Sequence, residues 1–271
     1  MKLFEINWTA IFDKLLDPYE VKARLFPGLL VLLPAILYFV LLHGSKSPVV
    51  VSLGTVLATC GGPYLLSNFV RTWGQRVQER LFRDWGGQPS TIMLRHRDST
   101  LSQPTKLKYH ALALGTLGIP MPSAQDEESN PDAADQSYAA AADALRPLTN
   151  DKKKFPFVFK ELVAYGFNRN AYGARWVGLG VCIASAWATL THANAIRHDS
   201  PYLNVTQIGN AHAVVLLIAF GVALLWSVHF TADTVRISGL SYSRRLWEAL
   251  EKIPKKPVRK TRATFEAGAR N

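Results

Sequence analysis

The chain has 271 residues, with 31 Lys and Arg against 20 Asp and Glu, and 48% of its residues are hydrophobic. The high apolar content excludes a disordered chain, and two cysteines are too few for a secreted module held by disulfides. The uneven spread of charge also excludes a simple soluble domain, because four stretches contain no Asp, Glu, Lys or Arg: 25–45, 47–70, 176–196 and 200–232.

The N-terminal segment, residues 1–24, is predicted to contain a cytosolic amphipathic helix. Leu3, Trp8, Ile11 and Leu15 recur at helical spacing. Such a pattern is typical of a helix that lies in the membrane interface. Packing of the same apolar face on the cytosolic part of the chain is the alternative.

Residues 25–70 are predicted to form a first transmembrane hairpin. Its two spans are expected at about 25–43 and 48–70. A helix needs roughly 20 apolar residues to cross a bilayer, and each span is long enough. Pro34 is expected to kink the first span, and Gly61-Gly62-Pro63 should weaken the second.

The segment 71–173 is predicted to be a mostly helical cytosolic insertion. Ser102 is expected to start a helix over 103–117, and the Ala-rich stretch 132–146 should form another. Continuous helices are expected at the two junctions with the membrane, at 66–85 and 156–194. The acidic, Pro- and Ser-rich stretch 118–133 is expected to be mobile.

Residues 174–231 are predicted to form a second transmembrane hairpin, with spans at about 174–194 and 211–231. Both spans carry small residues at every fourth position, which let membrane helices approach closely. The stripes predicted to pack are Gly178, Cys182 and Ala186 in one span and Ala219, Ala223 and Ser227 in the other. A second stripe, Gly180, Ala184 and Ala188, lies one face over. We expect packing within one chain; packing between subunits of a homo-oligomer is the alternative.

The C-terminal segment, 232–271, is predicted to hold a short amphipathic helix and a basic tail on the cytosolic side. Leu246, Trp247 and Leu250 share one side of that helix. A basic cluster beside a membrane binds anionic headgroups at about 1 kcal/mol per charge, so the expected partner is an anionic inner leaflet. No nucleic-acid-binding module accompanies the tail, so specific binding of nucleic acid is not expected.

The distribution of basic residues predicts the topology. All Lys and Arg except Lys46 and Arg197 lie in residues 1–24, 71–175 and 236–270, on the predicted cytosolic side, and basic residues gather on the cytoplasmic side of membrane proteins. The sequence therefore predicts an all-α integral membrane protein with four transmembrane helices in two hairpins and both termini in the cytosol. A multi-pass protein of the bacterial inner membrane is expected.

A basic cluster in the cytosolic segment is the main candidate for ligand binding. Its residues are Arg95, His96, Arg97, Lys106, Lys108 and Tyr109. Guanidinium groups suit phosphate, so a nucleotide, a lipid headgroup or another anionic ligand would fit. The alternative is a solvated basic surface that faces an anionic membrane.

Other ionisable groups give weaker signals. His229 and Asp233 are spaced one helical turn apart at the inner end of the fourth span, where such a pair can line an ion path or form a local hydrogen bond. His43, His192, His198 and His212 fall near the predicted outer face without a short metal-ligand spacing. No catalytic motif is recognisable, so neither an enzyme nor a metal or cofactor is predicted.

Two functions fit these features. The first is a non-enzymatic protein that senses a cytosolic ligand or protein and alters membrane permeability, as a channel-like protein or a bacterial effector in phage defence would. The second is a membrane-anchored scaffold that recruits a cytosolic partner. The predicted continuous helices between cytosol and membrane favour the first.

Overall fold

The computed structural model describes residues 17–44, 47, 51–52, 61–196 and 204–254, and every regular element among them is helical. These residues divide into two compact units. Unit 1 comprises Met1–Pro89 and Phe159–Tyr242, and unit 2 comprises Ser90–Val158 and Ser243–Asn271. The predicted N-terminal amphipathic helix and the basic tail lie outside the described residues.

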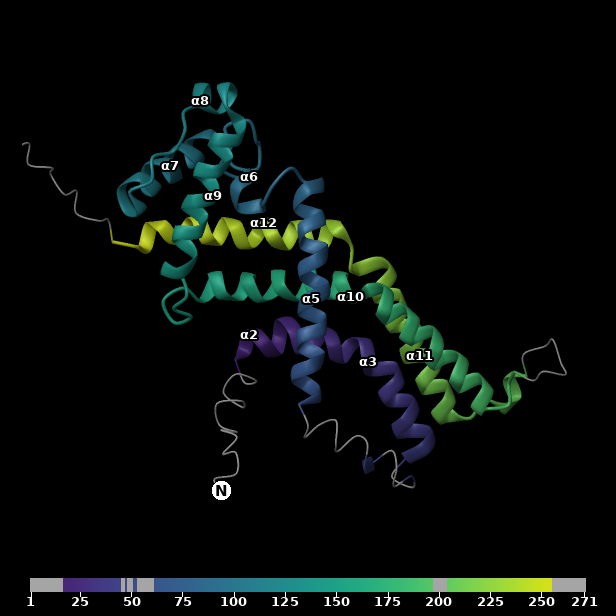
Figure 1. Ribbon diagram of the computed structural model, residues 1–271. Helices are drawn as coiled ribbons and strands as arrows, with labels where there is room; N and C mark the ends of the chain where they lie inside the picture. The colour runs from purple at the N-terminus through teal and green to yellow at the C-terminus, as the bar shows by residue number, and fades with distance from the viewer. Residues whose placement is uncertain (1–16, 45–46, 48–50, 53–60, 197–203, 255–271) are drawn as a thin grey trace, which may run out of the picture. The chain divides into compact units, whose positions relative to one another are not determined.

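Unit 1 begins with one uninterrupted helix, Pro18–His43 (Figure 1). Its successive segments are α2 (Pro18–Glu20), the π-helical η1 (Val21–Leu25), α3 (Phe26–Tyr38) and the π-helical η2 (Phe39–His43). Asp17 caps its start by accepting a hydrogen bond from the Tyr19 amide at 3.2 Å. Helical structure continues through Pro34, and Gly44, at φ +57°, follows the last turn.

Three longer helices complete unit 1. They are α5 (Gly62–Asp84), most of α10 (Pro156–His192), and α11 (Asn210–Leu224) with its π-helical continuation η5 (Leu225–His229). A 3₁₀ turn, η4 (Val205–Gln207), precedes α11, and the start of α12 (Ala232–Glu248) follows η5.

Two apolar clusters hold unit 1 together. The larger cluster gathers side chains from α3, α10, α11 and η5 around Trp226, which is fully buried. Its other buried members are Val31, Ala171, Ala174, Cys182, Val222 and Phe230. The smaller cluster joins α5, α10 and α12 through Leu81, Tyr165 and Val235. Small residues on α10 therefore face one large aromatic side chain on its neighbour.

Unit 2 is built from short helices. They are α6 (Pro89–Ile92), α7 (Gln103–Leu117), α8 (Ala124–Ser129), α9 (Pro131–Leu148), the first residues of α10, the end of α12, and η6 (Ala249–Lys252). The amphipathic side predicted near the C-terminus is confirmed as a core face, because Leu246, Trp247 and Leu250 are fully buried. Trp247 Nε1 also donates a hydrogen bond to the Ser90 carbonyl at 3.0 Å.

Several sequence predictions agree with these elements and one does not. The helix over 103–117 is confirmed, with Ser102 as its first flanking residue and Gly118 after its end. The expectation that 118–133 is mobile is wrong, because α8 forms there. The Ser123 hydroxyl accepts the Asp126 amide while Asp126 accepts the Ser123 amide, which caps the helix. The polar residues of 118–133 led to the prediction of a mobile segment, but two of them, Ser123 and Asp126, form the cap that starts α8.

Two described helices are long and apolar enough to cross a membrane, Pro18–His43 and Asn210–His229. They contain the first span in full and most of the fourth. The first helix starts before the predicted boundary at residue 25. The third predicted span is helical as the second half of α10 but is not one of these two. In the second predicted span, α5 begins at Gly62 after Gly61 at φ +84°, and residues 53–60 are not described.

Candidate functional site

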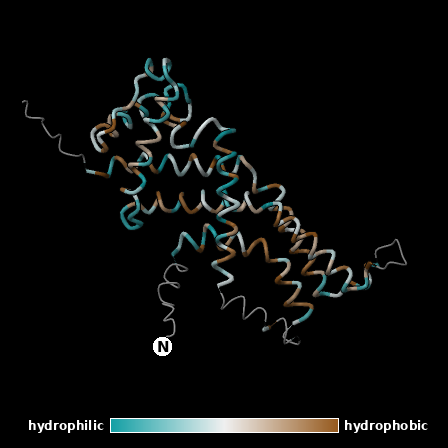
Figure 2. The backbone as a smooth tube through the Cα atoms, viewed as in Figure 1, coloured by the Kyte–Doolittle hydropathy of each residue, from teal (hydrophilic) through white to brown (hydrophobic). Residues whose placement is uncertain are grey.

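Hydrophobic residues predominate along α3 and α11 of unit 1 (Figure 2). Large aliphatic side chains on its helices are mostly exposed, including Ile183 at 69%, Leu217 at 70% and Val228 at 73%. Along α3, Leu29, Leu32, Ile36 and Val40 are exposed as well. Soluble monomers rarely expose continuous apolar surfaces of this kind. These exposed side chains are compatible with contact to an apolar environment such as lipid.

The interior of the same bundle is mainly apolar but also holds buried polar side chains. Asn170 and Thr189 are fully buried, and Ser185 is 5% exposed. Thr189 Oγ1 donates a hydrogen bond to the Ser185 carbonyl at 2.7 Å, so its polarity is satisfied within α10. Unit 1 therefore exposes large apolar side chains on its surface while its apolar core also contains a few polar ones.

The small-residue stripe on α10 lies against η5. A Cβ atom added to Gly178 would lie 2.4 Å from Trp226 Cε2, so only glycine fits beneath the indole. Cys182 is buried, and Ala186 is partly buried on the same side. The structure therefore brings this predicted stripe to a helix interface within one chain.

The stripe on the fourth span is only partly buried. Ala219 is 2% exposed and Ala223 packs on the main cluster, whereas Ser227 is exposed and bonds the Ala223 carbonyl. The second stripe on α10 also faces outward, since Gly180 and Ala184 are exposed. The outward-facing positions leave packing between subunits as a prediction.

The closest helix crossing was not predicted. A Cβ atom on Gly173 of α10 would lie 2.6 Å from the Trp73 backbone carbon of α5, and one on Gly74 would lie 2.0 Å from Asn170 Oδ1. The two helices thus touch through their backbones. The sequence signal was present, because glycines interrupt two otherwise strong helical patterns at Gly74 and Gly173.

Two members of the predicted basic cluster, Arg95 and Lys106, are used inside unit 2. Arg95 is 8% exposed and forms a two-pronged ion pair with Asp135, at 2.8 Å from Nε and 2.7 Å from Nη2. Lys106 is fully buried, and its Nζ donates to the carbonyls of His96 and Asp98. The contacts of Arg95 and Lys106 therefore stabilise the segment that leads from Arg95 into α7.

Glu127 is the centre of this network and was not predicted as a site residue. It is 3% exposed and accepts hydrogen bonds from the His96 amide at 2.7 Å and from the Tyr138 hydroxyl at 2.8 Å. Burial pushes the pKa of Glu127 upward, but these bonds and the Arg97 amide and charge outweigh it, so its pKa is lowered. Glu127 is therefore a buried carboxylate held in its charged form.

Two other members of the basic cluster, Arg97 and Lys108, are more accessible. The Arg97 guanidinium lies 3.5 Å from a Glu127 oxygen and 3.7 Å from an Asp135 oxygen, and its side chain is 47% exposed. Lys108 forms an ion pair with Glu251 at 2.8 Å, and the Lys108 side chain is 56% exposed. Tyr109 is buried, and burial raises its pKa. His96 and Arg97 border an open pocket of about 1090 Å³. Ligand binding by this cluster stays a prediction, for which Arg97 is the informative residue.

The predicted pair of His229 and Asp233 is not brought together. Helix η5 ends at His229, and Phe230, at φ −83° and ψ 82°, breaks the helix before α12 begins. The His229 carbonyl instead accepts the Thr234 hydroxyl at 2.6 Å. Within the described part of the chain, no ion pair joins the two side chains.

His43, His192 and His212 lie close together in unit 1. His192 Nδ1 and His212 Nε2 are 3.0 Å apart, and the His43 and His192 rings are 5.2 Å apart. They come from η2, α10 and α11, which the sequence placed at one face of the membrane. Among the described residues, no group of three or more His, Cys, Asp and Glu side chains could hold a metal ion.

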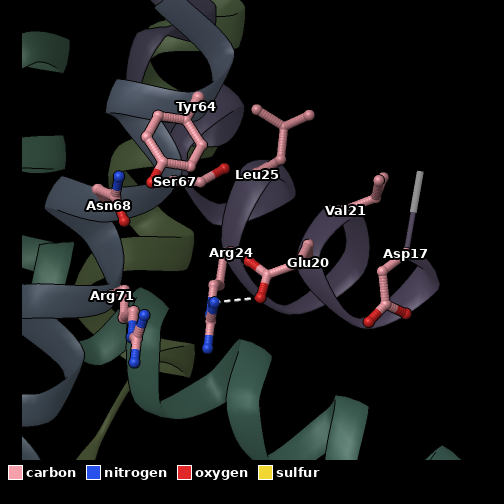
Figure 3. A pocket seen from close by; sticks show the side chains of 9 residues that line it. All are labelled: Asp17, Glu20, Val21, Arg24, Leu25, Tyr64, Ser67, Asn68 and Arg71. Carbon is pink, nitrogen blue, oxygen red and sulfur yellow. Dashed lines mark hydrogen bonds and ion pairs between the residues drawn. The ribbon is translucent and has the colours of Figure 1, made fainter. Parts of the chain in front are cut away.

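A polar pocket of about 310 Å³ lies between the start of the first helix and α5 (Figure 3). Its lining residues are Asp17, Glu20, Val21, Arg24 and Leu25 from the first helix and Tyr64, Ser67, Asn68 and Arg71 from α5. Arg24 pairs with Glu20. The Arg24 Nε atom is buried and has no hydrogen-bond partner among the described residues. The pocket is therefore lined by charged groups of both signs.

Comparison of the chain with models of protein families, with curated proteins and with solved structures gave no match.

Proposed function

We propose that the chain is a multi-pass integral membrane protein with four spans and both termini in the cytosol. The exposure of large apolar side chains on the helices of unit 1 is the observation that carries this proposal. Exposed Ile183, Leu217 and Val228 suit lipid, while buried Asn170 and Thr189 have their hydrogen bonds inside the bundle. The cationic balance of the loops supports an inner-membrane location.

We propose further that the protein changes membrane permeability when its cytosolic part responds to a ligand or partner. Helix α10 supports this role, because its 37 residues run unbroken from Pro156 in unit 2 to His192 in unit 1. We propose that a change in unit 2 is passed along this helix to unit 1. At Gly178 such a shift would reach Trp226, which sits in a π-helical segment. Single π-turns are frequent at functional positions in helices.

Flux from liposomes tests this function. The full chain, reconstituted into vesicles loaded with potassium ions, should raise ion leak above that of empty vesicles. Gly178→Ala forces the Trp226 ring to move and should change the leak. Gly180→Ala is the matched control, because a Cβ atom there meets nothing within 4 Å. Equal leak from all vesicles, with the protein inserted, would refute a permeability function.

A scaffold that recruits a cytosolic partner is the second candidate. The open pocket beside Arg97 favours it, since unit 2 has a surface hollow of about 1090 Å³ that can receive a partner. An inserted protein without flux that still retains a cytosolic protein on affinity purification would support the scaffold.

A further inference from the structure

We infer that the pocket between the first helix and α5 binds the headgroup of a zwitterionic, amine-bearing phospholipid of the phosphoethanolamine type. This inference rests on the proposed insertion of unit 1 into a membrane. The pocket is described in full by residues of unit 1, and its volume of about 310 Å³ lies at the lower end of the range of small-molecule sites.

The depth of the pocket matches the headgroup layer. Arg24 is the last charged residue before the apolar stretch of the first helix, and Arg71 is the first charged residue after that of the second predicted span. Charged residues that border spans lie at the level of the headgroups. Both arginines line the pocket, so it opens at the boundary where phosphates lie.

The arrangement of charges selects the class of headgroup. In Figure 3 the Arg24 and Arg71 side chains lie beside one another, while Asp17 lies at the other end of the pocket. Guanidinium groups bind phosphate through parallel N–H donors. Glu20 pairs with Arg24, so the Asp17 carboxylate at the far end is the group that would attract an ammonium group. A headgroup with phosphate at one end and ammonium at the other satisfies both ends.

Donors for the phosphate are available. Arg71 is exposed, and no carboxylate of a described residue lies within ion-pair distance of it. Arg24 lines the pocket beside it, with Glu20 as its ion-pair partner. Above them, exposed Tyr64 and Leu65 on α5 and Phe26 on the first helix provide apolar surface for acyl chains. The pocket therefore combines a polar end for the headgroup with an apolar surface for the tails.

Native mass spectrometry of the full chain in detergent tests the inference. The protein is titrated with phosphatidylethanolamine, phosphatidylcholine and phosphatidylglycerol of equal chain length. Phosphatidylethanolamine should bind at least about tenfold more tightly than the other two, since the trimethylated amine of phosphatidylcholine cannot donate hydrogen bonds. Arg71→Ala should weaken this binding about tenfold or more, and Arg71→Lys should restore part of it.

Three further measurements make the outcome decisive. Asp17→Asn should reduce the preference for phosphatidylethanolamine over phosphatidylglycerol. Arg80→Ala on the same helix is the control and should bind as the unmodified chain does, because Arg80 is exposed and outside the pocket. Soluble phosphoethanolamine should compete only weakly without acyl chains. Equal binding of all three lipids, an unchanged affinity after Arg71→Ala, or binding of the soluble compound alone would overturn the inference.

Resistance of the unmodified chain to carbonate extraction is measured in parallel. Extraction of the protein by carbonate would refute membrane insertion itself, whereas an inserted protein that does not select among the lipids would refute only the lipid site.

Discussion

Asn170 donates a hydrogen bond from Nδ2 to the carbonyl oxygen of Ala23 at 2.6 Å, and both residues are fully buried. This carbonyl lies four residues before Pro27, which has no N–H to close the usual helical bond to it. The Asn170 side chain thus supplies the donor that proline removed. Its Oδ1 atom accepts Arg169 Nη2 at 3.0 Å, so the amide is used at both ends.

Replacing Asn170 should therefore destabilise unit 1. Asn170→Asp removes the donor and places a carboxylate beside a carbonyl. A loss of about 1–3 kcal/mol is expected, as for a buried polar group left unsatisfied. Thermal unfolding of the full chain in detergent, followed by tryptophan fluorescence, measures the change. Asn168→Ala is the control, since its side chain makes no hydrogen bond with a described residue; equal effects of the two variants would contradict the role of Asn170.

Gly173→Ala should separate α5 from α10. The new methyl group would lie 2.6 Å from the Trp73 backbone carbon, and backbone atoms cannot rotate away as a side chain can. Overpacking of this kind costs about 1–3 kcal/mol. Gly180→Ala adds the same methyl group to the same helix where space is open, and should stabilise by about 0.5–1 kcal/mol. The two melting temperatures should move in opposite directions; a shared direction would argue against a backbone contact.

The stability of unit 2 should fall as the solution becomes acidic. Burial lowers the pKa of His110 below 6.5, and hydrogen bonds lower that of Glu127 below 4.5 despite burial. Both groups bind protons more readily in the unfolded chain, so the stability they contribute is complete above pH 6.5 and is lost in two steps. The first begins below pH 6.5 through His110, and the second below pH 4.5 through Glu127.

A pH series of unfolding midpoints checks this sign. His110→Gln should remove the step that begins near pH 6.5 and leave the lower one. Glu127→Gln should lower stability at pH 7 by about 2 kcal/mol, because a neutral amide replaces a charged acceptor, and should weaken the lower step. A midpoint that rises on acidification from pH 7 to 5 would show that the signs are wrong.

Arg95 and Arg97 should differ in their importance for folding. Arg95→Ala leaves Asp135 without its two-pronged partner and should cost about 2 kcal/mol or more. Arg97→Ala removes a half-exposed side chain with longer contacts and should cost less than about 1 kcal/mol. If Arg97→Ala stays folded yet loses a membrane phenotype such as dye entry on overexpression, the cluster binds a ligand. A retained phenotype would leave it as a membrane-facing surface.

The four-span topology can be tested by labelling with an impermeant maleimide in intact cells. Single cysteines at Lys46 and Arg197 should react from outside, and those at Thr100 and Ala267 only after lysis. The cost of about 2.5–3.5 kcal/mol for placing Lys or Arg at mid-bilayer keeps these residues out of the spans, and the bias of basic loops toward the cytoplasm decides the side. Reaction of Thr100→Cys in intact cells would contradict the model.

The sequence by itself determined the helical class, the long α10 and the positions of the apolar stretches. These features depend on local composition, since charge-free stretches such as 25–45 and helix signals such as Ser102 before 103–117 act over a few turns. It also marked Gly178 and Cys182 as packing residues, because small side chains at every fourth position share one helix face.

Only the tertiary structure decided how the charged residues are used. Arg95 was grouped with Arg97 by proximity along the chain, but its partner Asp135 is 40 residues away. Glu127 fell in a stretch that reads as mobile, and the Asn170 contact to Ala23 joins residues 147 apart. Contacts between residues so far apart in the chain depend on which helix faces pack together. The periodicity of side chains shows which face of a helix is apolar, but it does not show which other helix packs on that face.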